Sequence, residues 1–364
     1  MNKKLLVCCT DAGGAANILP VIDYCNNQPI SVFLLTGENT KKYFFNYKKD
    51  ILKNEVQRLD DAICILSKIK PNILFCGTAR LSESPENLLI KAAEKLNIFS
   101  IAYIDEWYNY KNRFFDKNTG NLHLPNKIAV NDKLAKFEAT QEGIPNDRCV
   151  ITGSPALERI IKKYQKYLNN NPSFPDYLTN DRIIITFLSE THSKDFGEKP
   201  GESGISGSYL GYTEEIVLND LILALKNVNK KCYLIEKIHP SDSRDYCKKV
   251  INDNITHISI KDCDLSILLW YSHLIIGMTS ISLLESAFMN KPIISYQPNL
   301  VGKNNCTASR LGAIDMVNNN TEFNQWIDKE LKSINSIDVG MSLQFLDCIN
   351  QDATLNIIKL MELD

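Results

Sequence analysis

Residues 274–287 read Leu-Ile-Ile-Gly-Met-Thr-Ser-Ile-Ser-Leu-Leu-Glu-Ser-Ala, which is the strongest local pattern in the sequence. The short apolar run predicts a buried strand at Leu274–Ile276. The residues after Gly277 predict a turn that opens a helix over Ser282–Phe288. This strand–turn–helix order is typical of one unit of a parallel α/β sheet, in which ligands bind at the carboxyl ends of the strands.

The hydroxyl groups in this stretch predict an anion-binding loop. Thr279, Ser280 and Ser282 lie where a helix begins, and free backbone N–H groups together with hydroxyls suit a mono- or diphosphate. Glu285 lies one turn inside the helix, where its carboxylate would accept from ribose hydroxyls. Ser and Thr are also ordinary helix N-caps, so the segment alone leaves both interpretations open.

Short apolar strands alternate with helical patterns on both sides of this stretch, which predicts two doubly wound α/β domains. The strands predicted in the second half are Ile183–Leu188, Cys232–Lys237, Thr256–Ile260, Leu274–Ile276 and Pro292–Tyr296, with helices at Glu214–Lys226 and Asp242–Ile251 and in the tail from Thr321. Those predicted in the first half are Leu5–Cys9, Ser31–Leu35, Ile73–Cys76, Ile98–Tyr103, Lys127–Val130 and Cys149–Ile151, with helices at Asn54–Ser67 and Glu86–Leu96.

The composition changes between these halves, where a polar stretch with Pro172 and Pro175 has little to bury. We expect an N-terminal Rossmann-like domain at 1–165, a linker at 166–181 and a C-terminal nucleotide-sugar domain at 182–340. A C-terminal helix within 341–364 could pack back on the first domain. The expected fold class is α/β, with the two domains facing an interdomain cleft.

The bulk composition limits the classes of function. The chain has 364 residues, 44% hydrophobic and 23% charged, with a formal net charge of −2 and no long basic run, which argues against nucleic acid as the main partner. No apolar stretch approaches the roughly 20 residues that span a bilayer. Eleven scattered cysteines without a C-x-x-C pair indicate reduced buried thiols in a cytoplasmic protein rather than disulfides or a metal site.

Two loops of the first half carry candidate ligand contacts. The first strand ends in Asp11-Ala12-Gly13-Gly14, followed by Asn17, where small residues let the backbone approach a ligand; a plain tight turn is equally compatible. The turn at Ser154 follows the last strand and directs a hydroxyl toward the predicted cleft.

The fourth predicted strand ends in Asp105-Glu106-Trp107. Two adjacent carboxylates among aromatic residues could hold one with a raised pKa, as a general base requires. The pair could instead begin a helix, and Arg113 nearby could neutralise it. Otherwise Trp107 and Arg113 are candidates to bind an acceptor, meaning a second substrate that enters the cleft from the N-terminal domain. Asp11 and Asn17 are further candidates for this acceptor side.

The second half adds two further loops. Residues 189–213 contain five glycines, which favours either a lid or disorder, and Glu190 is the member expected to contact a ligand. Lys237-Ile238-His239-Pro240 follows a strand, so that His239 can donate to a phosphate oxygen and stabilise a leaving nucleotide. An exposed loop histidine without a role is the other interpretation.

Over most of its length the chain resembles GT-B glycosyltransferases, in Gly277–Glu285 followed by Asn290–Ile294 and in Val150–Pro155. A narrower resemblance is to bacterial sialyltransferases, which share an acidic pair, a His-Pro pair and a pair of hydroxyl residues. Here these are Asp105-Glu106, His239-Pro240 and Thr279-Ser280, although Trp107 replaces the motif's Gly and the order of Thr and Ser is reversed.

This resemblance implies an inverting, metal-independent transfer of an acidic sugar (sialic, pseudaminic or legionaminic acid, or Kdo) from a CMP-linked co-substrate to a glycan acceptor. Asp105 or Glu106 would be the base, and His239 with Lys237 and Pro240 would assist departure of CMP. No other cofactor is implied. Peripheral association with the inner face of the membrane and the oligomeric state both stay open.

Three alternatives remain at this stage. A UDP-GlcNAc 2-epimerase would use the same fold without an acceptor, and a UDP-sugar or CDP-glycerol transferase would use a different donor. A non-catalytic nucleotide-binding partner subunit would keep the fold without the chemistry.

Overall fold

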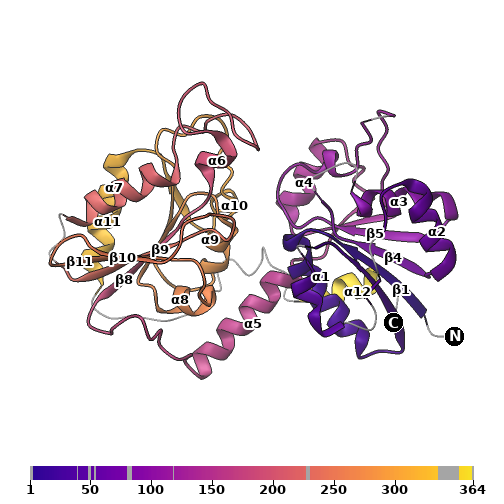
Figure 1. Ribbon diagram of the computed structural model, residues 1–364, viewed down its shortest axis with the longest axis horizontal. Coiled ribbons are helices and arrows are strands. Elements are labelled where there is room, and N and C mark those ends of the chain that lie inside the picture. Colours follow the sequence, from indigo (N-terminus) through magenta and orange to yellow (C-terminus); the bar gives the residue numbers. More distant parts are fainter. Residues whose placement is uncertain are drawn as a thin grey trace. The chain divides into compact units, whose positions relative to one another are not determined.

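A computed structural model describes residues 3–38, 40–47, 51–52, 55–79, 84–117, 119–226, 230–334 and 352–362. The chain divides into two compact units (Figure 1). The first runs from the N-terminus to Arg159 and includes the C-terminal helix α12 (Ala353–Leu360). The second runs from Ile160 through α11 (Asn320–Ser333).

The first unit is a parallel sheet with the order β3-β2-β1-β4-β5-β6-β7 among the described residues. Its strands are β1 (Lys3–Cys9), β2 (Ile30–Thr36), β3 (Ile51–Leu52), β4 (Ile73–Cys76), β5 (Phe99–Tyr103), β6 (Lys127–Val130) and β7 (Cys149–Ile151). Its helices are α1 (Ala12–Asn26), η1 (Lys41–Tyr47), α2 (Leu59–Ile69), α3 (Pro85–Leu96), η2 (Lys111–Arg113), α4 (Lys133–Gln141), the start of α5 (Pro155–Asn169), and α12.

Helices cover both faces of this sheet (Figure 1). Leu5, Val7 and Cys9 of β1 point to the face covered by α1 and α12, where Ile357 and Ile358 belong to the same buried cluster. Because residues 5–9 of β1 are buried on both faces, this part of the strand is an uninterrupted apolar run rather than an alternating pattern.

The second unit repeats this architecture, with the order β10-β11-β9-β8-β12-β13-β14 among the described residues. Its strands are β8 (Ile183–Leu188), β9 (Cys232–Lys237), β10 (Cys247–Val250), β11 (Ile255–Ile260), β12 (Leu274–Gly277), β13 (Ile293–Tyr296) and β14 (Asp315–Val317). Its helices are the rest of α5, α6 (His192–Phe196), α7 (Glu214–Lys226), α8 (Leu265–Tyr271), α9 (Ile281–Ser286), α10 (Thr307–Arg310) and α11. Apart from the antiparallel edge strand β10, all the strands are parallel.

In the first unit β1 lies between β2 and β4, and in the second unit β8 lies in the same way between β9 and β12. The reversal of strand order falls between β1 and β4 in the first unit and between β8 and β12 in the second. Such a switch point opens a crevice at the carboxyl ends of the strands. The predicted pair of doubly wound sheets is therefore confirmed.

The predicted helix at Asp242–Ile251 is wrong. Residues 247–250 form the edge strand β10, which pairs with β11, and every side chain in it is exposed. The Asp242 carboxylate accepts from the backbone N–H of Arg244 at 2.9 Å, which turns the chain before the strand. This segment has no apolar stripe to pack, so nothing favours a helix over a hairpin.

Helix α5 continues through the first residues of the predicted linker and ends at Asn169. Leu157, Ile161 and Tyr164 are buried along one face of it, and the Tyr164 ring stacks on Trp270 with centroids 6.2 Å apart. The division between the two compact units falls within this helix, between Arg159 and Ile160.

The glycine-rich segment 189–213 is folded rather than irregular. It contains α6 and a bridge between Ser203 and Ser208. The backbone N–H of Ser206 donates to the Asp195 carbonyl at 2.7 Å. A Cβ at Gly204 would lie 2.3 Å from the Lys194 carbonyl oxygen, so only glycine allows this approach. Within the described residues, no helix is both long and apolar enough to span a membrane.

Candidate functional site

Asp105 lies directly after β5, at the carboxyl edge of the first sheet. Its side chain is only 8% exposed, and a Cβ at Gly13 would lie 2.4 Å from its Oδ2. Burial raises the pKa of Asp105 to about 7; the negative charges of Glu106 and Asp11 raise it further, while Arg113 opposes the shift. The absence of a side chain at Gly13 thus makes room for a carboxyl group at the start of α1.

Glu106 is held differently from its neighbour. The fully buried guanidinium of Arg113 donates to Glu106 Oε2 at 2.6 Å, and a second nitrogen donates to Thr78 Oγ1 at 2.8 Å. The same nitrogen is 3.5 Å from Asp105 Oδ1. Arg113 therefore neutralises the acidic pair, the alternative that the sequence left open, and its guanidinium does not reach the surface to bind an acceptor.

A buried polar network lies beneath Asp105. Asn17 Oδ1 accepts from Ser154 Oγ at 2.8 Å and from Tyr103 Oη at 3.1 Å, and Asn131 Nδ2 donates to the Asp105 carbonyl at 3.3 Å. Asn17 and Ser154 are buried, so their polar atoms serve this network. Tyr103 and Asn131 were not predicted from the sequence as members of the site. Each lies at the carboxyl end of a predicted strand, and this position is the feature by which they could have been found.

Trp107 connects the acidic loop to α4. Its indole N–H donates to Asp132 Oδ2 at 2.6 Å, and Asp132 Oδ1 caps α4 by accepting from Ala135 N at 2.8 Å. The Trp107 ring is buried, so it supports the loop rather than presenting a flat surface to an acceptor. Asp11 caps α1 by accepting from Gly13 N at 3.3 Å.

In the second unit, a carboxylate of the chain itself occupies the predicted anion-binding loop. Glu190 Oε1 accepts from the backbone N–H groups of Met278, Thr279 and Ser280 at 3.3, 2.7 and 3.0 Å. Glu190 Oε2 accepts from Thr279 Oγ1 at 2.5 Å. The donors that the sequence offers for a ligand phosphate are thus held by Glu190 in this structure.

His192, which the sequence analysis missed, completes this arrangement. Its Nε2 is 3.4 Å from Glu190 Oε2 and 3.2 Å from Thr279 Oγ1. Burial opposes charge on both groups, but their mutual attraction and the hydrogen bonds outweigh it. The pKa of Glu190 is therefore lowered and that of His192 raised, which favours an ion pair.

The remaining predicted residues of the second unit lie in nearby loops. Lys237 Nζ donates to the Ile238 carbonyl at 2.8 Å, and burial lowers the pKa of this lysine. His239 is exposed next to Pro240, with Nδ1 2.7 Å from Ser241 Oγ. These groups follow β9 at the carboxyl edge of the sheet.

Within α9 and its cap, Ser282 N donates to Ser280 Oγ at 3.2 Å, so Ser280 is the N-cap. Burial raises the pKa of Glu285 to about 7, and the positive charge of Lys163 opposes this shift.

Gly14 of the first unit is buried, and a Cβ added to it would lie 3.2 Å from Cys9 Sγ.

No family model matches the chain, and no curated protein matches it in sequence. Solved structures do match it over almost the full length. UDP-GlcNAc 2-epimerase from Methanocaldococcus jannaschii has a TM-score of 0.65 and 16% identity, covering 99% of this chain and 100% of its own. UDP-GlcNAc 2-epimerase from Neisseria meningitidis, solved with UDP-GlcNAc, has a TM-score of 0.61 and 14% identity, covering 99% and 100%.

MurG from Acinetobacter baumannii is also similar, with a TM-score of 0.54 and 11% identity over 99% of both chains. This chain has the GT-B fold. At these identities the likeness concerns the fold alone. It agrees with the wider resemblance that the sequence indicated and adds no support for the narrower one to sialyltransferases that use CMP-linked sugars.

Proposed function

We propose that this protein acts on a UDP-linked N-acetylhexosamine and inverts its configuration at carbon 2. The observation that carries the proposal is Asp105, a nearly buried carboxyl group with a pKa of about 7 beside the start of α1. The two epimerases with the same fold, which are named for UDP-GlcNAc, support the choice of reaction and substrate.

Carbon 2 has no neighbouring carbonyl carbon to stabilise a carbanion, so the electron pair of its C–H bond has to form a C1–C2 double bond while the C1–O bond to UDP breaks. Addition of UDP back to carbon 1, with a proton delivered to the opposite face of carbon 2, then gives the epimer. The group that takes the proton must be ionised at neutral pH and still basic enough to accept it, which a pKa near 7 provides. Asp105 Oδ2, which lies against Gly13 at the start of α1, is the proposed acceptor of the proton. Glu106 Oε2 accepts from Arg113 at 2.6 Å and positions that cation.

The second unit supplies the groups proposed to bind the nucleotide. His239 and Lys237 would contact phosphate oxygens, and the Glu285 carboxyl would accept from ribose hydroxyls. Thr279, Ser280 and Ser282 are proposed phosphate donors as well. Because Glu190 already accepts from the first two of these, a phosphate at this position has to displace its carboxylate.

Transfer of a CMP-linked acidic sugar to a glycan is the second candidate. The specific observation in its favour is again Asp105, because a base of this pKa would also deprotonate an acceptor hydroxyl. The two candidates differ in nucleotide and in the need for an acceptor, so one set of measurements separates them.

The test is incubation with UDP-GlcNAc in D₂O without any acceptor, followed by proton NMR of the sugar. We expect deuterium at carbon 2 and accumulation of the carbon-2 epimer. Asp105→Asn should abolish both, whereas Asp60→Asn, at an exposed position in the first turn of α2, should leave them unchanged.

A parallel thermal-shift series with UDP and CMP identifies the nucleotide, because a ligand that binds only the folded state raises its stability. Stabilisation by UDP together with exchange at carbon 2 supports epimerisation. Stabilisation by CMP alone, without exchange, would overturn the proposal in favour of the CMP-sugar transferase.

A further inference from the structure

One face of α4 carries a continuous stripe of polar and aromatic side chains. Lys133, Lys136, Phe137, Thr140 and Gln141 recur at the spacing that places residues on one side of a helix. The opposite side is buried through the small residues Ala135 and Ala139. The Phe137 ring on the outer face is 62% exposed, although a large apolar side chain gains free energy when it is buried.

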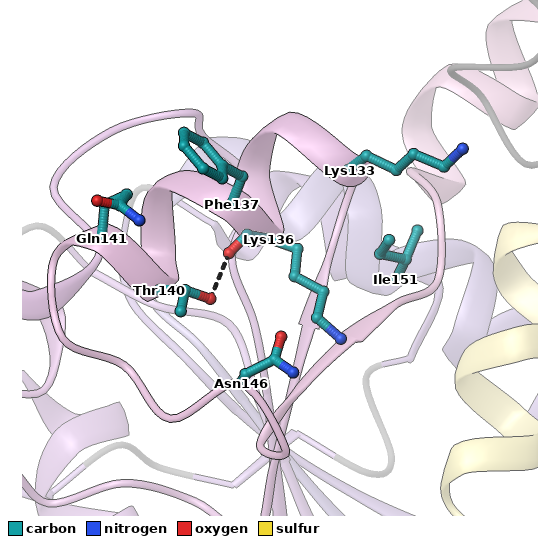
Figure 2. A pocket seen from close by; sticks show the side chains of 7 residues that line it. All are labelled: Lys133, Lys136, Phe137, Thr140, Gln141, Asn146 and Ile151. Atoms are coloured by element: carbon teal, nitrogen blue, oxygen red, sulfur yellow. Dashed lines mark hydrogen bonds between the residues drawn. The ribbon is translucent and has the colours of Figure 1, made fainter.

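The stripe borders a surface concavity of about 300 Å³ whose other lining residues are Asn146 and Ile151. Figure 2 shows Lys136 extending from α4 toward Asn146, and Lys133 extending outward beyond Ile151. Ile151, at the end of β7, is 38% exposed. The surface therefore combines two apolar side chains with two cations around one hollow.

None of the described residues that line the concavity is acidic. Among the described residues, neither Lys133 nor Lys136 donates its ammonium group to a hydrogen bond or an ion pair. The carboxylates of α4 lie on another side of the helix, where Glu138 accepts from Tyr110 Oη at 3.1 Å and Glu142 accepts from Lys111 N at 2.8 Å. The stripe thus places two ammonium groups next to exposed apolar surface.

We propose that this face of α4 docks on an anionic phospholipid surface. Phospholipid phosphates would pair with Lys133 and Lys136, and Phe137 and Ile151 would enter the boundary between headgroups and acyl chains. Charge complementarity argues for this occupant, because cations flanking protruding apolar side chains match a layer with anionic groups above hydrocarbon. The inference is independent of the proposed reaction.

The test is flotation of the full-length protein with vesicles of phosphatidylcholine, with and without phosphatidylglycerol. We expect binding only when phosphatidylglycerol is present, and weaker binding as salt increases. Lys133→Gln and Lys136→Gln should each weaken binding about fivefold. Phe137→Ser should weaken it about tenfold.

Matched controls separate this effect from loss of folding. Phe45→Ser removes a phenylalanine that is 63% exposed on η1, and Lys248→Gln with Lys249→Gln removes two exposed cations from β10. Both control proteins should bind as the unmodified protein does, and the Lys133, Lys136 and Phe137 variants should retain its unfolding transition.

Three outcomes would overturn the proposal. The first is an absence of binding to phosphatidylglycerol vesicles, and the second is binding that the α4 variants leave unchanged. The third is binding of a soluble acidic oligosaccharide that depends on Lys133 and Lys136 while vesicles do not bind, which would assign the concavity to a glycan.

Discussion

Asp105 in the first unit and Glu190 in the second are both carboxylates at the carboxyl edge of a parallel sheet, close to the start of a helix. Their side chains are 8% and 13% exposed, so burial is similar. Their pKa values nevertheless move in opposite directions, upward for Asp105 and downward for Glu190.

The difference lies in the donors around each carboxylate. Glu190 accepts from three backbone N–H groups and a hydroxyl, and it faces His192. Asp105 shares one guanidinium with Glu106 at the longer distance of 3.5 Å. Donors decide whether a buried carboxylate stays charged, so Glu190 is suited to stabilise the loop and Asp105 to exchange a proton.

The largest expected effect follows from Asp105→Asn, which removes the base and keeps the size of the side chain. We expect turnover in the carbon-2 exchange reaction to fall about 10³-fold. Because the folded-state pKa is raised from 3.8 to about 7, the native carboxyl loses stability as pH rises through that window. The variant should therefore match the native protein below about pH 4 and become more stable than it as pH rises, with roughly 2–3 kcal/mol of that difference developing between pH 5 and pH 7.

Glu106→Gln is the internal control for this assignment. It removes the carboxylate that pairs with Arg113 and leaves Asp105 in place. Turnover should fall less than in Asp105→Asn, while stability should fall more, because the buried guanidinium loses its closest partner. The reverse order in denaturation and kinetic measurements would mean that Glu106 is the base.

The second-largest effect is expected for Glu190→Gln. This substitution should lower the free energy of unfolding by about 2 kcal/mol at pH 6, because the charge-assisted hydrogen bonds from the backbone N–H groups are lost. The lowered pKa of Glu190 means that its contribution is present above the ordinary value of 4.5 and disappears as pH falls through the folded-state pKa. The raised pKa of His192 makes its share complete below 6.5 and lost as pH rises through its own folded-state value.

Urea denaturation of native and Glu190→Gln proteins across pH 3–8 measures this window. The stability difference should be greatest between the ordinary pKa values of 4.5 and 6.5, where both contributions are complete, and should shrink toward pH 3. A difference that is constant with pH would show that the carboxylate is not ionised in the loop. Asp195→Asn, in the same segment, tests whether any loss of charge there has the same effect.

Much of the architecture was predictable, because strands buried on both faces leave apolar runs such as Ile183–Ile185 and Leu274–Ile276. Residues 242–251 were wrongly predicted to form a helix, because a short polar segment carries no hydrophobic periodicity that distinguishes a helix from a hairpin. The sequence pattern at 277–282 predicts donors for a ligand phosphate, and in the structure Glu190 accepts from the donors of residues 278–280. Sequence patterns could not identify Glu190 as their acceptor, since it approaches from another strand.

The same limit applies to Arg113 and Trp107. Both lie near the acidic pair in sequence, which made them candidates for ligand contact. Their burial depends on Thr78, after β4, and on Asp132, after β6, which meet them only in the folded sheet. The sequence indicated the positions of candidate groups at strand ends, and tertiary contacts decided which of these groups are occupied by the protein itself.

A smaller effect is expected from Gly13→Ala, which tests the geometry around Asp105. The new Cβ would lie 2.4 Å from Asp105 Oδ2, so the carboxyl group has to move. We expect turnover to fall about tenfold, because a displaced base meets its substrate in fewer productive orientations. Stability should change little, since alanine is favoured over glycine within a helix. Ala16→Gly in the same helix is the control that leaves Asp105 untouched and should retain turnover.

The smallest expected effect is that of Arg113→Lys on the pH dependence of kcat/KM. The native profile should rise with pH through about 7, as Asp105 becomes ionised. Lysine keeps the positive charge but cannot donate to Glu106 and Thr78 while also facing Asp105, so the cation stabilises ionised Asp105 less well. The ascending limb should move to higher pH by about half a unit. If the limb stays in place while kcat falls equally at every pH, Arg113 serves only to hold the loop, and the contrast between Asp105 and Glu190 must rest on the donors around Glu190 rather than on the cation that Asp105 shares.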